Sequence, residues 1–375
     1  MMTYDEFCEK VKKDLLELLP DDYQNAEIVV ESIKKNNGLI YEGISARMPG
    51  ENISPIVYLN SYYEQYLEGT YYPEVVDNIA GKLVKYKVAD TGFEISKLLD
   101  YEYIKDKLTL YLCNYEKNIS LLEEVPHEIK GDYALIVKCQ VARDEESSAG
   151  FTIKNSHLKA MNVTKEQLFK DAYISAVKLM PPELKSMKEV LQSVMPGFEL
   201  DDVEPAMYVL TNIAKSCGAA CLFYPGLMEE IGKQLKSDFH IIPSSVHECI
   251  IITGDFTSAH IQEMITEVND TQVDPLEVLG TRPSTYDIIQ KEIIPMCEYE
   301  DHIREIREDI VKNGYKPTNQ IINGIRLIEK NVGRRCELKD MYSLAKMPEK
   351  NAEVKKTLDS IFKQFKLQEM KIPKL

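Results

Sequence analysis

The pattern of apolar and polar positions is clearest between residues 217 and 279. Residues 218–224 form a short apolar run between turn residues, which predicts a buried strand. Pro225 and Gly226 end that run. The apolar positions that follow recur at helical spacing and predict a helix with one buried face, formed by Leu227, Ile231 and Leu235.

Two strands and a second helix are predicted to complete this stretch. Residues 238–242 and 246–253 read as strands joined by a turn at Pro243-Ser244-Ser245. Thr257 or Ser258 can cap the next helix, whose apolar side chains repeat every three or four positions, at Ile261, Met264, Ile265 and Val268. The order strand, helix, strand, strand, helix predicts an α+β fold, a mixed sheet with packed helices.

The N-terminal part of the chain shows the same mixture. Thr3 and Glu6 match a capping box for a first helix. Residues 26–33 and 39–46 predict a hairpin around Asn37-Gly38, because Asn-Gly favours the tight turns of hairpins.

A cluster of tyrosines follows the hairpin, and Tyr58, Tyr62 and Tyr66 lie four residues apart. A helix would place these three on one face, and tyrosine combines a large apolar surface with one polar group. They fit a helix packed on the sheet, with a partner-binding surface as the alternative.

The pattern changes after residue 293. Only helical periodicity is visible there, over residues 302–311, 318–328, 338–345 and 351–367. We therefore expect an α+β body at 1–293, with two lobes at about 1–100 and 101–293 as a further expectation. An all-helical C-terminal module is expected at 294–375.

The charge changes at nearly the same place. Residues 301–375 hold 17 Lys and Arg against 11 Asp and Glu, whereas the first 300 residues hold 28 against 50, a net charge of −22. The negative charge of the first 300 residues argues against their non-specific binding to nucleic acids or anionic membranes, because these ligands are also negatively charged. The basic segment is either a solvated helical surface or a nucleic-acid contact through residues 295–375, for which the candidate side chains include Arg326, Arg334 and Arg335.

Composition favours a cytoplasmic protein. The eight cysteines are scattered without any CxxC pair, which is typical of reduced thiols. No apolar run is long enough to span a membrane, and the first residues carry acidic side chains instead of a signal peptide.

Several segments resemble a bacterial family of unknown function that occurs in clostridial gut bacteria, often on mobile elements. The resemblance covers about residues 1–279 and rests on the motifs at residues 114–118, 121–127, 218–220, 243–248, 267–269 and Val273, of which Pro-Ser-Ser-Val-His-Glu is the most specific. The continuation usual in that family is replaced here by residues 280–283 and 286–287. The resemblance supports the fold expectation and a link to mobile elements, and it implies no chemistry.

The same hexapeptide and the cysteine that follows it hold the strongest candidates for catalysis. Ser244, Ser245, His247, Glu248 and Cys249 place hydroxyls, a base, a carboxylate and a thiol within six residues, as nucleophilic catalysis requires. Strand geometry would put Ser245, His247 and Cys249 on one face and the other two on the opposite face, so a nucleophile would need a partner from elsewhere. The alternatives are a hydrolase centred on residues 244–248 and polar residues that only shape a turn.

Metal and cofactor sites are not expected. His247-Glu248 begins a zincin-like motif, but Ile251 stands where the second histidine is required. A zinc site could be assembled from Cys217, Cys221, His240, His247 and Cys249, although cysteine in apolar runs behaves as a small hydrophobe. Neither GxGxxG nor GxxxxGK[ST] occurs, so no phosphate-binding loop is predicted.

These observations favour a non-enzymatic protein-interaction or regulatory factor whose partner is another protein. The alternatives are a nucleic-acid-associated protein and a hydrolase.

Overall fold

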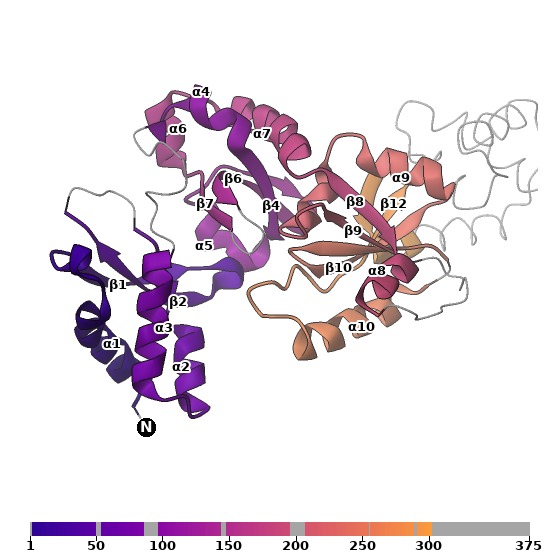
Figure 1. The fold of residues 1–375 in the computed structure, drawn as a ribbon. Helices are drawn as coiled ribbons and strands as arrows, with labels where there is room; N and C mark the ends of the chain where they lie inside the picture. The colour runs from indigo at the N-terminus through magenta and orange to yellow at the C-terminus, as the bar shows by residue number, and fades with distance from the viewer. Residues whose placement is uncertain are drawn as a thin grey trace, which may run out of the picture. The chain divides into compact units, whose positions relative to one another are not determined.

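The computed structural model describes residues 2–49, 54–85, 97–143, 148–195, 207–254, 256–288 and 291–301 (Figure 1). The chain forms two compact units. Unit 1 comprises residues 1–109, 113–128 and 136–175, and unit 2 comprises residues 110–112, 129–135 and 176–375. Helices and antiparallel sheets confirm the α+β class. The helices predicted beyond residue 301 lie outside the described residues.

The first part of unit 1 is a three-stranded antiparallel sheet with helices on one face. Its elements are α1 (Tyr4–Leu18), β1 (Glu27–Lys34), β2 (Ile40–Arg47), β3 (Val57–Tyr58), α2 (Asn60–Leu67) and α3 (Tyr72–Lys85), with 3-10 turns at Asp21–Tyr23 and Asn36–Gly38. The capping box at Thr3 and Glu6 is confirmed. The predicted hairpin is confirmed too, and its turn uses the positive φ angles of Asn37 (60°) and Gly38 (71°).

Tyr62 lies in the core of this part with Tyr66 packed against it, and the three tyrosines do not form one row. Tyr58 lies in β3, so only Tyr62 and Tyr66 share helix α2, and the expected three-residue face is wrong. Tyr62 is 4% exposed, and the ring of Tyr66 stacks on buried Phe7 with centroids 5.7 Å apart. The tyrosine hydroxyl accepts a hydrogen bond from the Met2 N–H. The structure thus shows a helix packed on the sheet; partner binding by these tyrosines stays a prediction.

A second sheet has the order β4-β6-β5, with β7 paired to β6. The elements around it are α4 (Tyr101–Ile104), a 3-10 turn (Lys105–Lys107), β4 (Leu108–Asn114), a 3-10 turn (Glu116–Asn118), α5 (Ile119–Leu122), β5 (His127–Lys130), β6 (Tyr133–Arg143), β7 (Ser148–Thr152), α6 (Asn155–Met161) and α7 (Lys165–Leu179). Strands β6 and β7 pair antiparallel, with a register shift between Gln140 and Ala142.

The motif at residues 114–118 has a structural use within unit 1. The Asn118 side chain is 1% exposed; its oxygen accepts the Asn37 N–H at 2.9 Å, and its nitrogen donates to the Asn114 carbonyl at 2.8 Å. Buried amide groups need such partners, so this asparagine fixes the β1–β2 turn against the turn that follows β4.

Unit 2 is built on a six-stranded sheet with the order β13-β12-β10-β11-β9-β8, in which every neighbouring pair is antiparallel. The expectation of a mixed sheet is therefore wrong for this sheet. Its elements are β8 (Pro182–Ser186), α8 (Met187–Val194), β9 (Met207–Asn212), η7 (Gly218–Phe223), α9 (Leu227–Leu235), β10 (Phe239–Ser245), β11 (Glu248–Ile252), α10 (Ser258–Thr271), β12 (Ser284–Asp287) and β13 (Glu292–Pro295).

Helices lie on both faces of this sheet (Figure 1). Helix α10 covers one face and buries Ile261 and Ile265 against Ile252 and Met296, whereas its expected contacts Met264 and Val268 are each 46% exposed. Thr257 caps α10 as predicted. Helix α9 covers the other face, where Gly232 allows close packing because a Cβ there would meet Ile288 Cγ2 at 2.8 Å.

Two predictions inside residues 217–279 are wrong. The apolar run at 218–224 forms the 3-10 helix η7 and no strand, because Gly218 must pass very close to the neighbouring loops. Pro243, Ser244 and Ser245 are the end of β10, whose register shifts between Pro243 and Ser245, so the turn falls at Val246 and His247.

The chain stays attached to unit 2 beyond the predicted boundary at residue 293, which falls inside β13. The buried Asp238 carboxylate accepts hydrogen bonds from the Ile288 N–H at 3.0 Å and the Tyr299 hydroxyl at 2.7 Å. Glu300 accepts the N–H and the hydroxyl of Ser258 at the start of α10, each at 2.6 Å. A separate module beyond residue 301 stays a prediction.

Candidate functional site

The hexapeptide Pro243–Glu248 forms the end of β10 and the turn into β11. The Ser245 hydroxyl oxygen accepts the His247 N–H at 3.0 Å, which closes the turn. Ser244 donates to Glu248 across the same turn at 3.5 Å. His247 therefore stands at the tip of a turn, and the predicted alternation of Ser245, His247 and Cys249 along one strand face is wrong.

Both ring nitrogens of His247 have partners in the described structure. Its Nδ1 accepts the backbone N–H of Cys217 at 3.1 Å, so the ring proton sits on Nε2, which donates to a Glu277 carboxylate oxygen 3.1 Å away. Cys217 has a positive φ angle of 54°, a conformation that is uncommon for residues other than glycine. The imidazole thus holds a strained backbone position in place.

Three further contacts surround this histidine. Thr211 donates its hydroxyl to the His247 carbonyl at 2.8 Å. The Asn212 side chain accepts the Ala214 N–H at 2.9 Å and donates to the Ser216 carbonyl at 2.8 Å. We call this set of residues the His247 clamp; it consists of Thr211, Asn212, Cys217, Gly218, Ser245, His247 and Glu277.

Gly218 lets the loops of the His247 clamp come together. A Cβ on this glycine would lie 2.5 Å from the His247 carbonyl oxygen and 2.8 Å from the Asn212 nitrogen, and it would also collide with Thr211 Oγ1. The Gly-Ala-Ala and Pro-Ser-Ser-Val-His-Glu motifs, about 25 residues apart in sequence, therefore pack directly against each other.

The hydrolase hypothesis finds no support in this geometry. His247 Nδ1 would have to give up the hydrogen bond that it accepts from the Cys217 N–H before it could take a proton from a nucleophile. Cys249 is fully buried, and burial raises the pKa of its thiol, which keeps it protonated.

The five residues considered for zinc do not assemble into a site. Within the described ranges no group of three or more His, Cys, Asp and Glu is placed to hold a metal ion. Burial raises the pKa of the Cys221 thiol to about 12. The His240 ring lies with Nδ1 at 2.9 Å from Thr285 Oγ1 and Nε2 at 3.1 Å from the Gly254 carbonyl.

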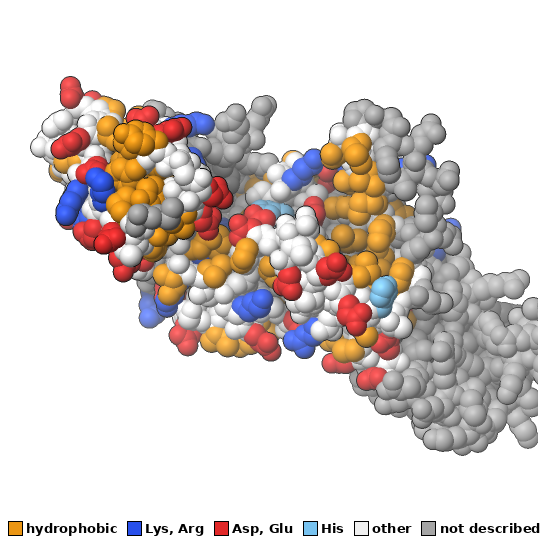
Figure 2. Space-filling view, turned by 90° about the horizontal axis from the view of Figure 1, so that it is seen from below, with side chains coloured by type: hydrophobic (Ala, Val, Ile, Leu, Met, Phe, Trp, Pro, Cys, Tyr) orange, Lys and Arg blue, Asp and Glu red, His pale blue; other side chains and the backbone are white. Residues whose placement is uncertain are grey.

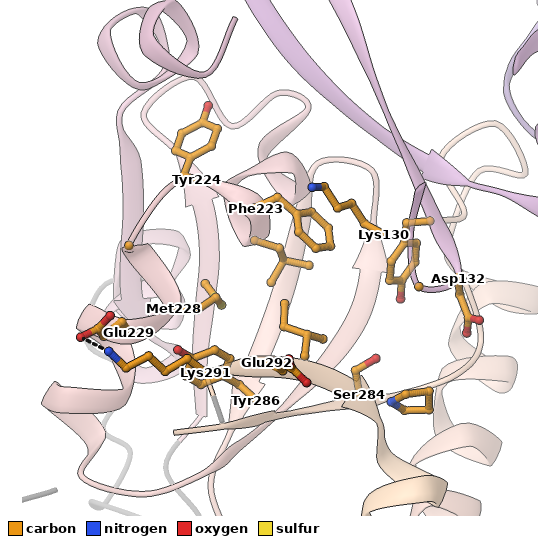
Figure 3. A pocket seen from close by; sticks show the side chains of 16 residues that line it. Lys130, Asp132, Phe223, Tyr224, Met228, Glu229, Ser284, Tyr286, Lys291 and Glu292 are labelled. Atoms are coloured by element: carbon orange, nitrogen blue, oxygen red, sulfur yellow. Dashed lines mark ion pairs between the residues drawn. The ribbon is translucent and has the colours of Figure 1, made fainter. Parts of the chain in front are cut away.

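A cavity of about 590 Å³ lies within unit 2, on the sheet face that α9 covers (Figure 3). Three segments line it. The β5–β6 turn contributes Lys130, Gly131, Asp132 and Tyr133. The segment from η7 into α9 contributes Leu222, Phe223, Tyr224, Gly226, Met228 and Glu229. The β12–β13 hairpin contributes Ser284, Tyr286, Lys291, Glu292, Ile293 and Pro295.

The cavity has an apolar floor. Tyr133, Leu222, Met228 and Tyr286 are all buried. Figure 3 shows Phe223 on one side of the cavity, and Ser284 and Glu292 of the β12–β13 hairpin on the other. Burial raises the pKa of Tyr286 to about 12, so at neutral pH its hydroxyl is protonated and can donate a hydrogen bond.

Charged side chains stand at the rim of the cavity. The Lys291 ammonium lies 2.9 Å from Glu229, which Lys233 also approaches to 2.9 Å, and these two lysines lower the pKa of the glutamate. Arg282 pairs with Asp132 at 3.0 Å. An apolar floor with a charged rim is the usual composition of a site that takes up an apolar group and orients it.

This cavity was not predicted from the sequence. Its lining comes from segments more than 150 residues apart, and each segment alone reads as an ordinary turn or strand. Two glycines that line the cavity, Gly131 and Gly226, mark its turns with positive φ angles of 61° and 79°. Arg326, Arg334 and Arg335 lie outside the described residues.

Comparison with known proteins adds a family and no activity. A model of a family of unknown function, DUF5688, matches residues 4–288. No curated protein and no solved structure matches the chain. A search of the described helices finds none of the length and apolarity that a membrane crossing requires.

The close approach at Gly218 predicts that Gly218→Ala lowers the free energy of unfolding by about 1–3 kcal/mol, because the added methyl group must push the clamp loops apart. Gly81→Ala in α3 is the matched control, since a Cβ there meets nothing within 4 Å; it should leave stability unchanged or raise it by up to about 1 kcal/mol. Urea unfolding of the full-length variants measures both, and equal stabilities would contradict the close packing.

The hydrogen bond to His247 predicts that His247→Ala costs about 1–3 kcal/mol of unfolding free energy, because the Cys217 N–H loses its acceptor. His247→Asn should recover part of this loss, since an amide oxygen can take the place of Nδ1. Thermal unfolding of the three proteins at one pH tests the idea. Were the alanine variant as stable as the parent, the clamp would not be structural.

Proposed function

The chain belongs to DUF5688, a family of unknown function, and we propose that it is a non-enzymatic protein-interaction factor that binds its partner at the cavity of unit 2. The cavity carries this proposal. A volume of about 590 Å³ suits one or two large side chains of a partner, and its buried aromatic floor offers the contacts that stabilise such an anchor.

The charged rim supports a protein partner. Lys130, Glu229, Lys291 and Glu292 bring both signs of charge to one small opening. Polar rims around an apolar centre are typical of protein interfaces, where the centre supplies most of the affinity and the rim supplies orientation.

The contacts of His247 and of the nearby cysteines weigh against catalysis as the main role. The histidine of the most specific motif uses both ring nitrogens in holding loops together, and the cysteines nearest to it in sequence are buried or strained. The side chains that could act in catalysis, His247 and the neighbouring cysteines, thus have structural roles in the described residues.

Filling the cavity tests this proposal. Ser284 lies on β12 and lines the cavity, so Ser284→Phe should place a phenyl ring in it while β12 keeps its pairing. We expect a partner that co-purifies with the full-length chain from its own host cell to fall by about tenfold or more in quantitative mass spectrometry.

Ser32→Phe is the control, since Ser32 is exposed on β1 in unit 1 and receives the same change in size. This variant should retain the partner. A partner retained equally by both variants would refute the cavity as the binding site.

A second candidate, nucleic-acid association through the basic segment after residue 300, rests on the charge asymmetry of the chain. Figure 2 shows no broad basic area on the visible face of the described residues, where acidic and basic side chains are interspersed. The excess of Lys and Arg over Asp and Glu in residues 301–375 makes the basic segment the candidate for phosphate contacts.

This candidate predicts that neutralising Arg326, Arg334 and Arg335 to Gln weakens binding to single-stranded or duplex DNA and lowers the slope of log affinity against log salt by up to about 3. The exposed lysines Lys12, Lys13 and Lys159, changed to Gln, serve as the charge-matched control. Equal slopes in both variants would rule the segment out as the contact.

A further inference from the structure

We infer that the partner segment is an extended peptide, which adds as a strand to the edge of β13 and places one apolar side chain in the cavity. This inference rests on the proposed function and specifies the form of the ligand. Two features of the β12–β13 hairpin lead to it: the position of β13 in the sheet and the alternation of its residues.

Strand β13 is the last strand of the six-stranded sheet among the described residues. Its register with β12 pairs Ser284 with Pro295 and Tyr286 with Ile293. The Met296 N–H donates to the Pro283 carbonyl at 3.0 Å, one step beyond this register. Because bonded and non-bonded pairs alternate in antiparallel sheets, Ile293 and Pro295 direct their backbone groups away from β12.

The same two residues line the cavity with their side chains. Ile293 and Pro295 share one sheet face with their partners Tyr286 and Ser284, and all four line the cavity. The cavity and the backbone groups that point away from β12 therefore meet on one short strand. An added strand would have its own side chains next to Ile293 and Pro295, at the position from which one could enter the cavity.

Pro295 limits the contact and fixes its register. Proline has no N–H, so the edge offers the N–H and carbonyl of Ile293 and only the carbonyl of Pro295. These few backbone hydrogen bonds contribute little affinity by themselves. Most of the binding free energy must therefore come from the peptide side chain in the cavity. The proline also hinders edge-to-edge pairing between two copies of the chain.

Charge selects the flanking residue of the peptide. Glu292 begins β13, lines the cavity and is exposed, whereas Lys291 beside it is held by Glu229 at 2.9 Å. The first 300 residues carry a net charge of −22. A peptide with Lys or Arg next to its apolar anchor therefore complements this edge, and an acidic peptide does not.

A phage-displayed library of 12-residue peptides, selected on the full-length chain, tests this inference. We expect enrichment of sequences with one large apolar residue beside Lys or Arg. A synthetic peptide of the enriched sequence should bind the Ser284→Phe variant about tenfold more weakly. It should bind the Glu292→Gln variant about twofold to fivefold more weakly, and with a smaller dependence on salt.

Methylation of single peptide nitrogens examines the backbone contact. One N-methyl group, at the residue whose N–H bonds to Ile293 or Pro295, should weaken binding by roughly threefold to tenfold, while methylation of its two neighbours, whose N–H groups point away from β13, should change little. The circular dichroism of each protein variant serves to confirm that it is folded.

The opposing results fall into separate classes. Peptides that lose affinity on Ser284→Phe but tolerate every N-methyl group would overturn strand addition and leave the cavity as the binding site. Peptides that bind parent and Ser284→Phe equally would place the contact elsewhere and would overturn the proposed function as well. Enrichment of acidic peptides, or of none, would overturn the inference.

Discussion

The hydrogen bond from the Cys217 N–H to His247 Nδ1 is the contact on which the arrangement of unit 2 depends. It ties the loop after β9 to the β10–β11 turn, and Glu277 adds a third loop through the other ring nitrogen. These loops carry backbone groups that are expensive to bury without partners. The imidazole satisfies one of them and holds Cys217 at a positive φ angle, so that η7 can begin at Gly218.

This role explains why the hexapeptide Pro243–Glu248 has the appearance of a catalytic site. Serine, histidine and glutamate are the residues of hydrolase sites, but they are also the residues that close turns, because their side chains reach nearby backbone groups. Ser245 accepts the His247 N–H and Ser244 donates to Glu248, both within the same turn. Asn118 does the same for unit 1, where it secures the β1–β2 turn. Polar residues close together in sequence are therefore weak evidence of chemistry until the partner of each polar atom is known.

The sequence predicts correctly those turns and helix starts that are determined by residues within a few positions. The capping box at Thr3, the turn at Asn37-Gly38 and the cap at Thr257 were all found, because each depends on residues within a few positions. The sequence predicts a strand where the structure has the helix at residues 218–223. The path of this segment depends on the close approach of Gly218 to Thr211 and His247, which are distant in sequence. Strands β12 and β13 have four residues each and were missed, because so short a run shows no periodicity. The cavity depends on the meeting of these unpredicted elements, so the candidate site could not be derived from the sequence.

The clamp and the cavity are connected through η7. Its first residue, Gly218, belongs to the clamp, and Leu222 and Phe223 near its end line the cavity. A 3-10 helix of six residues has little stability of its own, so the position of its end depends on how its start is held. His247 can therefore affect the shape of the cavity without lining it, by fixing the wall that Phe223 provides. The hexapeptide Pro243–Glu248 thus maintains the shape of a cavity that other residues line.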